Sequence, residues 1–148
     1  MGGSGDGPET DDSERGSAVV EFTFLALLLM VPVVYFVVTI AQIQAGSFAV
    51  VGAADQAAKV FVVQPDAERA RAAAEQAVVV ALADFGHGRD EAAVEIVCNR
   101  DDCLSAGAVV TATVRLTVPL PMVPFGEALH LEASRLHASS SQVVGRFR

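Results

Sequence analysis

Charged residues are absent from one long stretch near the amino terminus of the chain. Between Glu21 and Asp55 the sequence holds no Asp, Glu, Lys or Arg, and the part from Phe22 to Ala41 is almost wholly apolar. A helix of about 20 apolar residues is about 30 Å long, which is enough to cross the hydrocarbon of a bilayer. The pattern therefore predicts one continuous helix over residues 17–63, with its first half in a membrane and its less apolar second half outside.

Two prolines bear on the course of this helix. Pro32 has no backbone N–H, so we expect a kink there, which membrane helices tolerate when neighbouring groups satisfy the freed carbonyl. Gln64 precedes Pro65, and a residue before proline avoids helical backbone angles. We therefore expect the helix to end close to Gln64.

Downstream of this point the sequence predicts one more helix and then a series of strands. Asp66 is a favourable N-cap for a helix over residues 67–85, and Gly86 is placed to close it. Alternating apolar and polar residues then predict three strands, at 92–98, at 110–118 and at about 129–139. The predicted fold class is an α+β membrane protein in which a long N-terminal transmembrane helix continues outside and is followed by a second helix and a small antiparallel sheet of about three strands.

Four segments follow from these patterns. Residues 1–16, which are rich in Gly, Asp and Ser, are expected to form a disordered leader. Residues 17–63 form the transmembrane and extended helix, and residues 64–141 form one extracytoplasmic α+β domain. Residues 142–148 are expected to be a poorly ordered tail.

The apolar run has three other interpretations. A buried helix of a soluble domain is disfavoured because the run is long and apolar on every side. A secretory signal peptide needs a basic segment ahead of its apolar core, whereas residues 1–15 carry Arg15 as their one base among several acids. An uncleaved membrane anchor remains open.

Composition and charge exclude several functions. The formal net charge of −8 does not suit a nucleic-acid-binding protein, which needs a basic face. The sequence has no phosphate-binding glycine loop and no nucleophile motif, and His87, His130 and His137 lack metal-ligand spacing. We therefore expect no enzymatic activity, no cofactor or metal, and no small-molecule substrate.

The two cysteines bear on the compartment. Cys98 and Cys103 enclose a short polar loop and are predicted to form a disulfide, the alternative being two free thiols at a hairpin. A disulfide suits an oxidising compartment. We therefore expect the amino terminus in the cytoplasm and the carboxyl-terminal domain outside the cell membrane.

Small residues recur in the second half of the long helix. Alanines at every fourth position form a ridge along one side of the helix, and such a ridge would let another long helix approach closely. The alternative is that an alanine-rich composition produces the series by chance. The ridge consists of Ala41, Ala45, Ala49, Ala53 and Ala57.

A carboxylate stands at the start of the apolar run, where a charge is costly and is therefore a functional candidate. The surrounding segment reads Glu14-Arg15-Gly16-Ser17-Ala18-Val19-Val20-Glu21-Phe22. Together with the helix that follows, it resembles the TadE-like pseudopilins of tight adherence (Tad/Flp) pilus systems. The resemblance covers Arg15 to about Val63, and the rest of the chain only in general layout.

The resemblance implies a processing site and a set of partners. In that family a prepilin peptidase cuts after the glycine, here Gly16, which leaves Ser17 as the new amino terminus and makes Glu21 the fifth mature residue. The new ammonium and the Glu21 carboxylate would offset part of each other's desolvation, within one chain or between neighbouring subunits. Glu21 and the adjacent Phe22 are thus expected to guide assembly with other pilin-like subunits.

A second functional class remains open. The chain would then be an uncleaved, membrane-anchored extracytoplasmic binding domain unrelated to pili. Its contact surface would be the proline-rich loop at residues 119–125.

Overall fold

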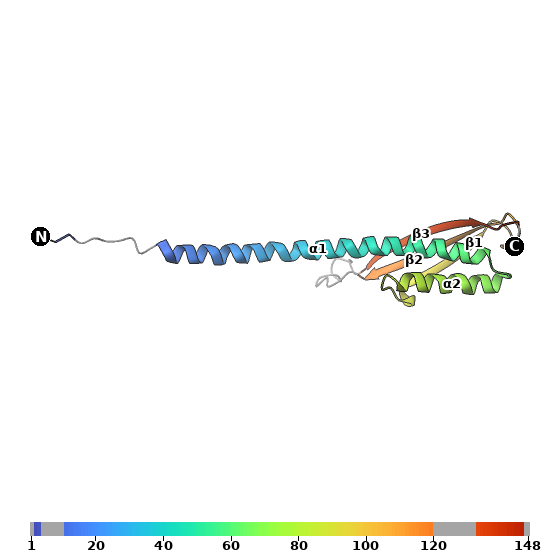
Figure 1. Cartoon of the computed structure of the whole chain (residues 1–148), viewed down its shortest axis with the longest axis horizontal. Coiled ribbons are helices and arrows are strands. Elements are labelled where there is room, and N and C mark those ends of the chain that lie inside the picture. The colour runs from blue at the N-terminus through green and yellow to red at the C-terminus, as the bar shows by residue number, and fades with distance from the viewer. Residues whose placement is uncertain (1, 4–10, 120–132, 147–148) are drawn as a thin grey trace. The chain divides into compact units, whose positions relative to one another are not determined.

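The computed structural model describes residues 2–3, 11–119 and 133–146 (Figure 1). The described residues divide into two compact units, residues 1–38 and 39–148, which are considered separately. The order of elements confirms the predicted long helix, second helix and three-stranded antiparallel sheet. The elements are α1 (Asp11–Val62), α2 (Ala67–Ala83), the short 3₁₀ helix η1 (Arg89–Glu91), β1 (Ala92–Cys98), β2 (Val109–Pro119) and β3 (Ala133–Val143).

Helix α1 begins earlier than the sequence predicts. Its first residue is Asp11, so the boundary predicted at Ser17 is wrong and part of the expected leader is helical. No proline or glycine interrupts residues 11–15, and acidic residues in a first turn interact favourably with the positive end of the helix dipole. The helix continues through Pro32 and ends at Val62, next to the predicted end.

Helix α2 begins at Ala67 as predicted but ends at Ala83, two residues before the predicted Phe85, and the two predicted capping residues, Asp66 and Gly86, make backbone contacts at its ends. The Asp66 carboxylate accepts a hydrogen bond from the backbone N–H of Arg69 at 2.8 Å, as an N-cap does. At the other end Gly86 has a positive φ of 79°, and its N–H donates to the carbonyl of Ala83 at 2.9 Å. The N–H of His87 donates to the carbonyl of Leu82 at 3.0 Å, which completes a glycine-closed helix end.

The sheet has β2 at its centre, with β1 and β3 as antiparallel neighbours. The predicted bounds of β1 are confirmed, and β2 is one residue longer at each end than predicted. β3 ends at Val143 rather than at Ser139. The expected start of this strand, residues 129–132, lies outside the described residues.

The predicted disordered tail is wrong for its first residues. Gln142 and Val143 belong to β3, and Val144 is buried. The Val144 N–H donates to the carbonyl of Ala108 at 2.8 Å, and its carbonyl accepts from the Gly107 N–H at 2.9 Å. This order follows from the burial of the Val144 side chain, which a count of neighbouring polar residues did not reveal.

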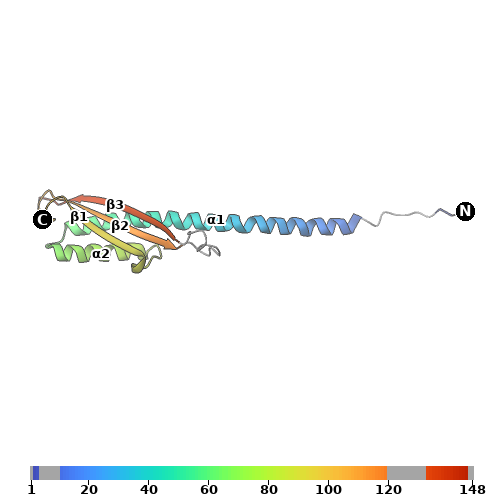
Figure 2. The same cartoon turned by 180° about the vertical axis from the view of Figure 1, so that it is seen from behind.

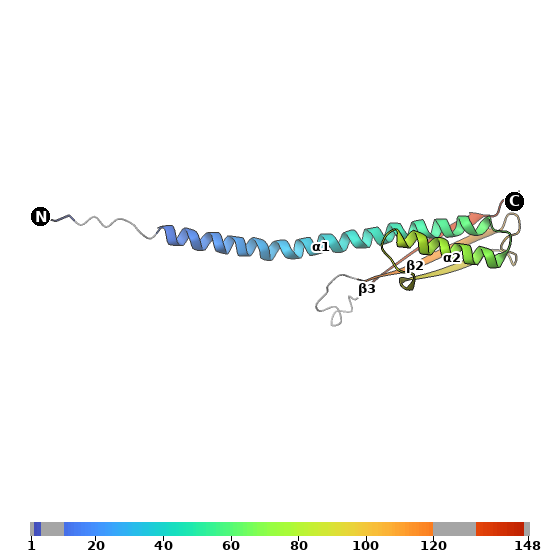
Figure 3. The same ribbon diagram turned by 60° about the horizontal axis from the view of Figure 1, so that its bottom comes forward.

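One face of the sheet forms the core of the second unit with α2 and the last turns of α1 (Figures 2 and 3). The alternate residues of β2 from Val110 to Val118 are all buried, in agreement with the predicted half-buried strand. The largest buried side chains from the helices are Phe61, Leu82, Val50 and Val78. The opposite face of the sheet carries mostly polar side chains, together with the exposed Val97 and Val143.

Gly46 marks a close approach between α1 and the sheet. A Cβ atom at this position would lie 2.7 Å from Leu136 Cδ1 and 3.0 Å from Val118 Cγ2. Only a glycine leaves room for these two side chains as they stand. Gly52, by contrast, has nothing within 4 Å of the same position.

Candidate functional site

The amino-terminal unit presents an apolar helix with no protein around it. Within residues 16–38 every side chain is exposed, and none of the most apolar 18-residue window is buried. By length and composition the segment Gly16–Val62 qualifies as a membrane span. An apolar face of this size is rare on monomeric soluble proteins. The segment is therefore compatible with a single-pass membrane anchor.

The predicted processing and assembly residues lie on the exposed surface of this helix. Ser17 and Glu21 are one turn apart, so their side chains lie on the same side of α1. Phe22 is 74% exposed, and nothing lies within 4 Å of a Cβ built at Gly16. Among the described residues the Glu21 carboxylate has neither a hydrogen bond nor an ion pair. Its carboxylate is thus available to a partner.

The bond between Gly16 and Ser17 lies inside α1. A peptidase that binds an extended backbone must therefore unwind this part of the helix before cleavage. Glycine lowers the cost of unwinding, because it is about 1 kcal/mol less favourable than alanine in a helix. The position is also fully exposed, so access to it needs no disruption of a core.

The alanine ridge is divided between two environments. Ala49, Ala53 and Ala57 are completely buried in the core that the chain forms with its own sheet and α2. Ala41 and Ala45 are exposed. The hypothesis that the whole ridge forms a seam for another long helix is therefore wrong for its last three members. Their small size lets α1 pack closely within the same chain.

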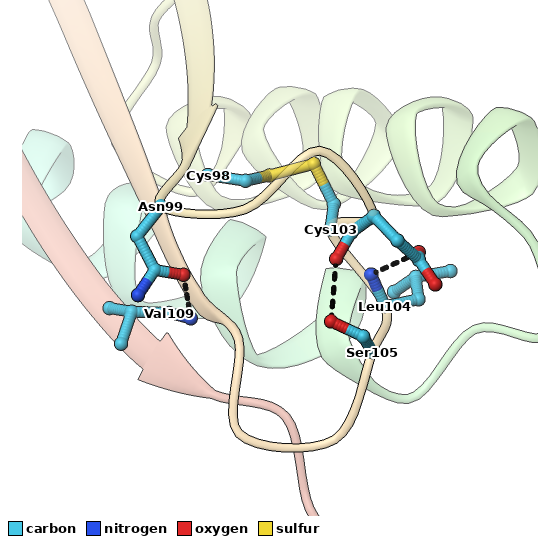
Figure 4. The surroundings of a disulfide bond; sticks show 7 residues. Cys98, Asn99, Cys103, Leu104, Ser105 and Val109 are labelled. Atoms are coloured by element: carbon cyan, nitrogen blue, oxygen red, sulfur yellow. Dashed lines mark hydrogen bonds between the residues drawn. A yellow bond between two sulfur atoms is a disulfide. The ribbon is translucent and has the colours of Figure 1, made fainter.

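The predicted disulfide is confirmed. Cys98 and Cys103 are joined by an S–S bond of 2.01 Å, with their Cα atoms 5.4 Å apart (Figure 4). Two hydrogen bonds also order the loop between β1 and β2. Asn99 Oδ1 accepts from the N–H of Val109 at 2.8 Å, and Ser105 Oγ donates to the carbonyl of Asp102 at 2.9 Å. The loop between β1 and β2 is therefore held at several points along its length.

The histidines do not gather into a site. His87 is half-buried and its Nδ1 lies 3.1 Å from Glu91 Oε2, whereas His137 is exposed on β3. His130 lies outside the described residues. Within the described parts of the chain, no group of three or more His, Cys, Asp or Glu side chains could hold a metal ion.

Most of the predicted contact loop, residues 120–125, also lies outside the described residues. Its first residue, Pro119, is the exposed last residue of β2. Pro119 lines a hollow of about 250 Å³ together with Gln42 and Ala45 of α1. The carboxyl end of β2 therefore lies beside the residues that directly follow the apolar run.

Sequence reasoning missed a hollow on the polar side of the sheet. It measures about 530 Å³, and its lining includes Arg115, Arg135 and His137. The alternation along the strands places these three residues on one face, so the register of β2 and β3 was the missing information. From the sequence alone, the pairing of Arg115 with His137 could not be read.

Comparison of the chain with protein-family models, with curated proteins and with solved structures finds no match. Its function is therefore inferred from its own residues and geometry.

Proposed function

We propose that the chain is a minor pilin-like subunit, similar to the TadE-like pseudopilins, that takes part in assembly of a tight adherence pilus. It is made as a precursor that a prepilin peptidase cuts after Gly16. The observation that carries the proposal is the position of Gly16, Ser17 and Glu21 at the start of the exposed apolar segment of α1. That helix runs on without interruption into a small disulfide-bonded α+β unit.

The physical role of Glu21 follows from its surroundings. Cleavage creates an ammonium at Ser17, one helical turn before the carboxylate. Both charges lie beside an apolar run that favours a bilayer, and an isolated charge there is costly. A carboxylate without a partner in its own described surroundings can pair with the ammonium of a neighbouring subunit. Such a pair would fix the axial position of one helix against the next.

Mass analysis of the mature protein tests the processing step. We expect the protein isolated from the membrane of its native cells to begin at Ser17. Gly16→Leu should retain the leader, because a large side chain replaces the glycine at the scissile bond. A mature protein that still begins at Met1 would exclude processing after Gly16.

Substitution of the carboxylate tests the assembly step. Glu21→Ala should leave membrane insertion and cleavage intact but reduce the number of assembled pili, counted by electron microscopy. Glu14→Ala is a matched control, since it removes the same group from the side of the scissile bond that is discarded. Equal piliation of the Glu21 variant and the wild type would contradict a role for Glu21 in assembly.

An uncleaved anchor is the second candidate function. The helical backbone across Gly16 and Ser17 favours it, because a helix protects its peptide bonds from proteolysis until it unwinds. The chain would then hold its α+β unit at the outer surface of the membrane as a binding domain. Retention of Met1 in the mature protein, with full membrane association, would support this function over the first.

A further inference from the structure

The side of the sheet that faces away from the helices changes character along its length. Over most of its length it carries Ser and Thr, for example Thr113 and Ser139, whose hydroxyls lie 2.8 Å apart. At one end it becomes basic, where Arg115, Arg135 and His137 lie at alternate positions of β2 and β3. The basic end stands apart in a chain whose net charge is −8.

The three basic side chains are close neighbours. Arg115 and His137 are directly opposite each other in the register of β2 and β3, and Arg135 is opposite Thr117, one pair further along the same face. Opposite side chains in antiparallel strands are about 5 Å apart at Cβ, and diagonal ones about 7 Å. All four residues line the hollow of about 530 Å³. The two guanidinium cations, Arg115 and Arg135, are placed so closely that they favour an anion between them.

The two nearby glutamates already have hydrogen-bond partners, which for Glu95 is Arg115 itself. Glu95 accepts a hydrogen bond from Arg115 at 2.9 Å, which uses one of the five N–H donors of that guanidinium. Glu91, which also lines the hollow, accepts from the Gly88 N–H at 3.1 Å and lies 3.1 Å from the His87 ring. Neither carboxylate therefore neutralises the whole cluster.

Asp90 is the other acid that lines the hollow. Its carboxylate folds back onto its own loop, since a Cβ at Gly88 would lie 2.6 Å from Asp90 Oδ1. Within the described parts of the chain, the side chains of Arg135 and His137 take part in no ion pair or hydrogen bond. Their donors, together with the Thr117 hydroxyl, are open to a ligand.

The hollow also lies at a particular end of the sheet. Thr117 is two residues from Pro119, which shares a smaller hollow with Gln42 and Ala45. In sequence Gln42 directly follows the apolar run that ends at Ala41. If this run lies in a bilayer, lipid headgroups are the anions nearest to this end of the sheet.

We propose that Arg115, Arg135 and His137 form a binding site for the phosphate of an anionic phospholipid headgroup. The planar guanidinium offers paired N–H donors that match phosphate oxygens. Basic groups near a membrane surface are also attracted to anionic lipid. This inference rests on the membrane anchoring in the proposed function, but not on cleavage at Gly16 or on pilus assembly.

Titration of the full chain in dodecyl maltoside micelles tests the site. The probe is short-chain dihexanoyl phosphatidylglycerol, followed through the side-chain NMR signals of ¹⁵N-labelled arginine. We expect Arg115→Gln with Arg135→Gln to raise the Kd about tenfold or more. Arg135→Gln alone, which leaves the pair between Arg115 and Glu95 intact, should raise it several-fold. Circular dichroism checks that each variant keeps its fold.

A matched control removes the same charge from α2. Arg69 and Arg71 are exposed on that helix, away from the hollow. Their double replacement by Gln should change the Kd by less than about twofold. An equal loss of affinity in this control would overturn the site, since general charge attraction would then explain the binding.

Two further probes identify the source of the phosphate. Dihexanoyl phosphatidylcholine, which has no net charge, should bind more weakly than phosphatidylglycerol. If inorganic phosphate binds as tightly as phosphatidylglycerol, the assignment to a lipid is overturned. If the mature protein keeps Met1 but still binds phosphatidylglycerol through Arg115 and Arg135, the pilin function fails and the lipid site stands.

Discussion

Gly46 lies at a close approach between α1 and the sheet. Alanine is a better helix former than glycine by about 1 kcal/mol, so a glycine with no close neighbours only lowers the stability of a helix. At Gly46 the missing side chain leaves space for Leu136 and Val118. At Gly52 no neighbour lies within reach. The two glycines of the same helix therefore have opposite roles.

We expect Gly46→Ala to lower the free energy of unfolding of the second unit by about 1 kcal/mol, because overpacking of about 1–3 kcal/mol exceeds the gain in helix propensity. Gly52→Ala is the matched control and should raise stability by up to about 1 kcal/mol. Thermal unfolding of the two variants, followed by circular dichroism, measures the difference. A Gly46 variant that is as stable as the Gly52 variant would show that the close approach is not tight.

At the residue scale, the sequence predicted caps that depend on near neighbours. Asp66 caps α2 and Gly86 closes it, both through contacts within a few residues along the chain. The burial of Gly46 and Val144 depends on residues far away in sequence. No local pattern distinguishes Gly46 from Gly52, so only the packing of the sheet could separate them.

Among the elements, β1 and β2 form a hairpin that is closed by the disulfide. The seven residues of β1 pair with β2 in continuous register. The disulfide joins the last residue of β1 to the loop, and Asn99 fixes the first residue of β2. The hairpin therefore combines local backbone order with a covalent closure.

Removal of the disulfide should weaken this unit. We expect Cys98→Ser with Cys103→Ser to lower the free energy of unfolding by about 2 kcal/mol, as the loop-entropy relation gives for so short a loop. Reduction of the wild type by dithiothreitol should lower its melting temperature to the same extent. The double variant, as the control, should not respond to dithiothreitol. A change below about 0.5 kcal/mol would be no larger than that of an ordinary surface substitution and would contradict this role.

The elements were predicted well where the hydrophobic period was clear. The bounds of β1 and the buried alternation of β2 followed from period-two patterns. The end of β3 was missed because Ser140 and Ser141 have little intrinsic strand preference. Their pairing with Ala112 and Thr111 makes them part of the strand. Pairing with a strong central strand overrode the weak intrinsic preference of serine.

For the whole molecule, the decisive feature is the division into two units of different kinds. Every buried hydrophobic residue of the described structure lies in the second unit, from Ala49 to Val144. The exposed large hydrophobic residues are concentrated in the first unit, from Val19 to Val38. The first unit therefore needs an apolar environment, whereas the second has a core of its own.

A fragment that starts at Thr39 should accordingly fold in water without detergent. We expect it to be soluble, with a cooperative thermal transition and a closed disulfide, because no core residue is lost. The full chain should sediment with membranes and require detergent. Circular dichroism and analytical ultracentrifugation measure these properties. A fragment that aggregates or melts without a cooperative transition would show that residues before Thr39 stabilise the second unit.

The sequence predicted an apolar helical segment through the absence of charge between Glu21 and Asp55, but it placed the domain boundary at residue 64, whereas the second unit begins at Thr39. It did not predict that α1 would supply a large share of the core, since Ala49, Ala53 and Ala57 also fitted a seam for a separate helix. Small side chains reveal that something packs closely against them, but not which segment does so. The sheet of the same chain is that segment.

The place of Val144 in the core has a consequence for how the protein is made. β2 is the central strand, and its second neighbour, β3, is synthesised after it. Until the ribosome has passed Val144, β2 has one unpaired edge that can associate with other chains. Export of the domain, which would begin at the part nearest the apolar helix, would lengthen this interval, so the synthesis of β3 sets when the nascent domain becomes safe from aggregation.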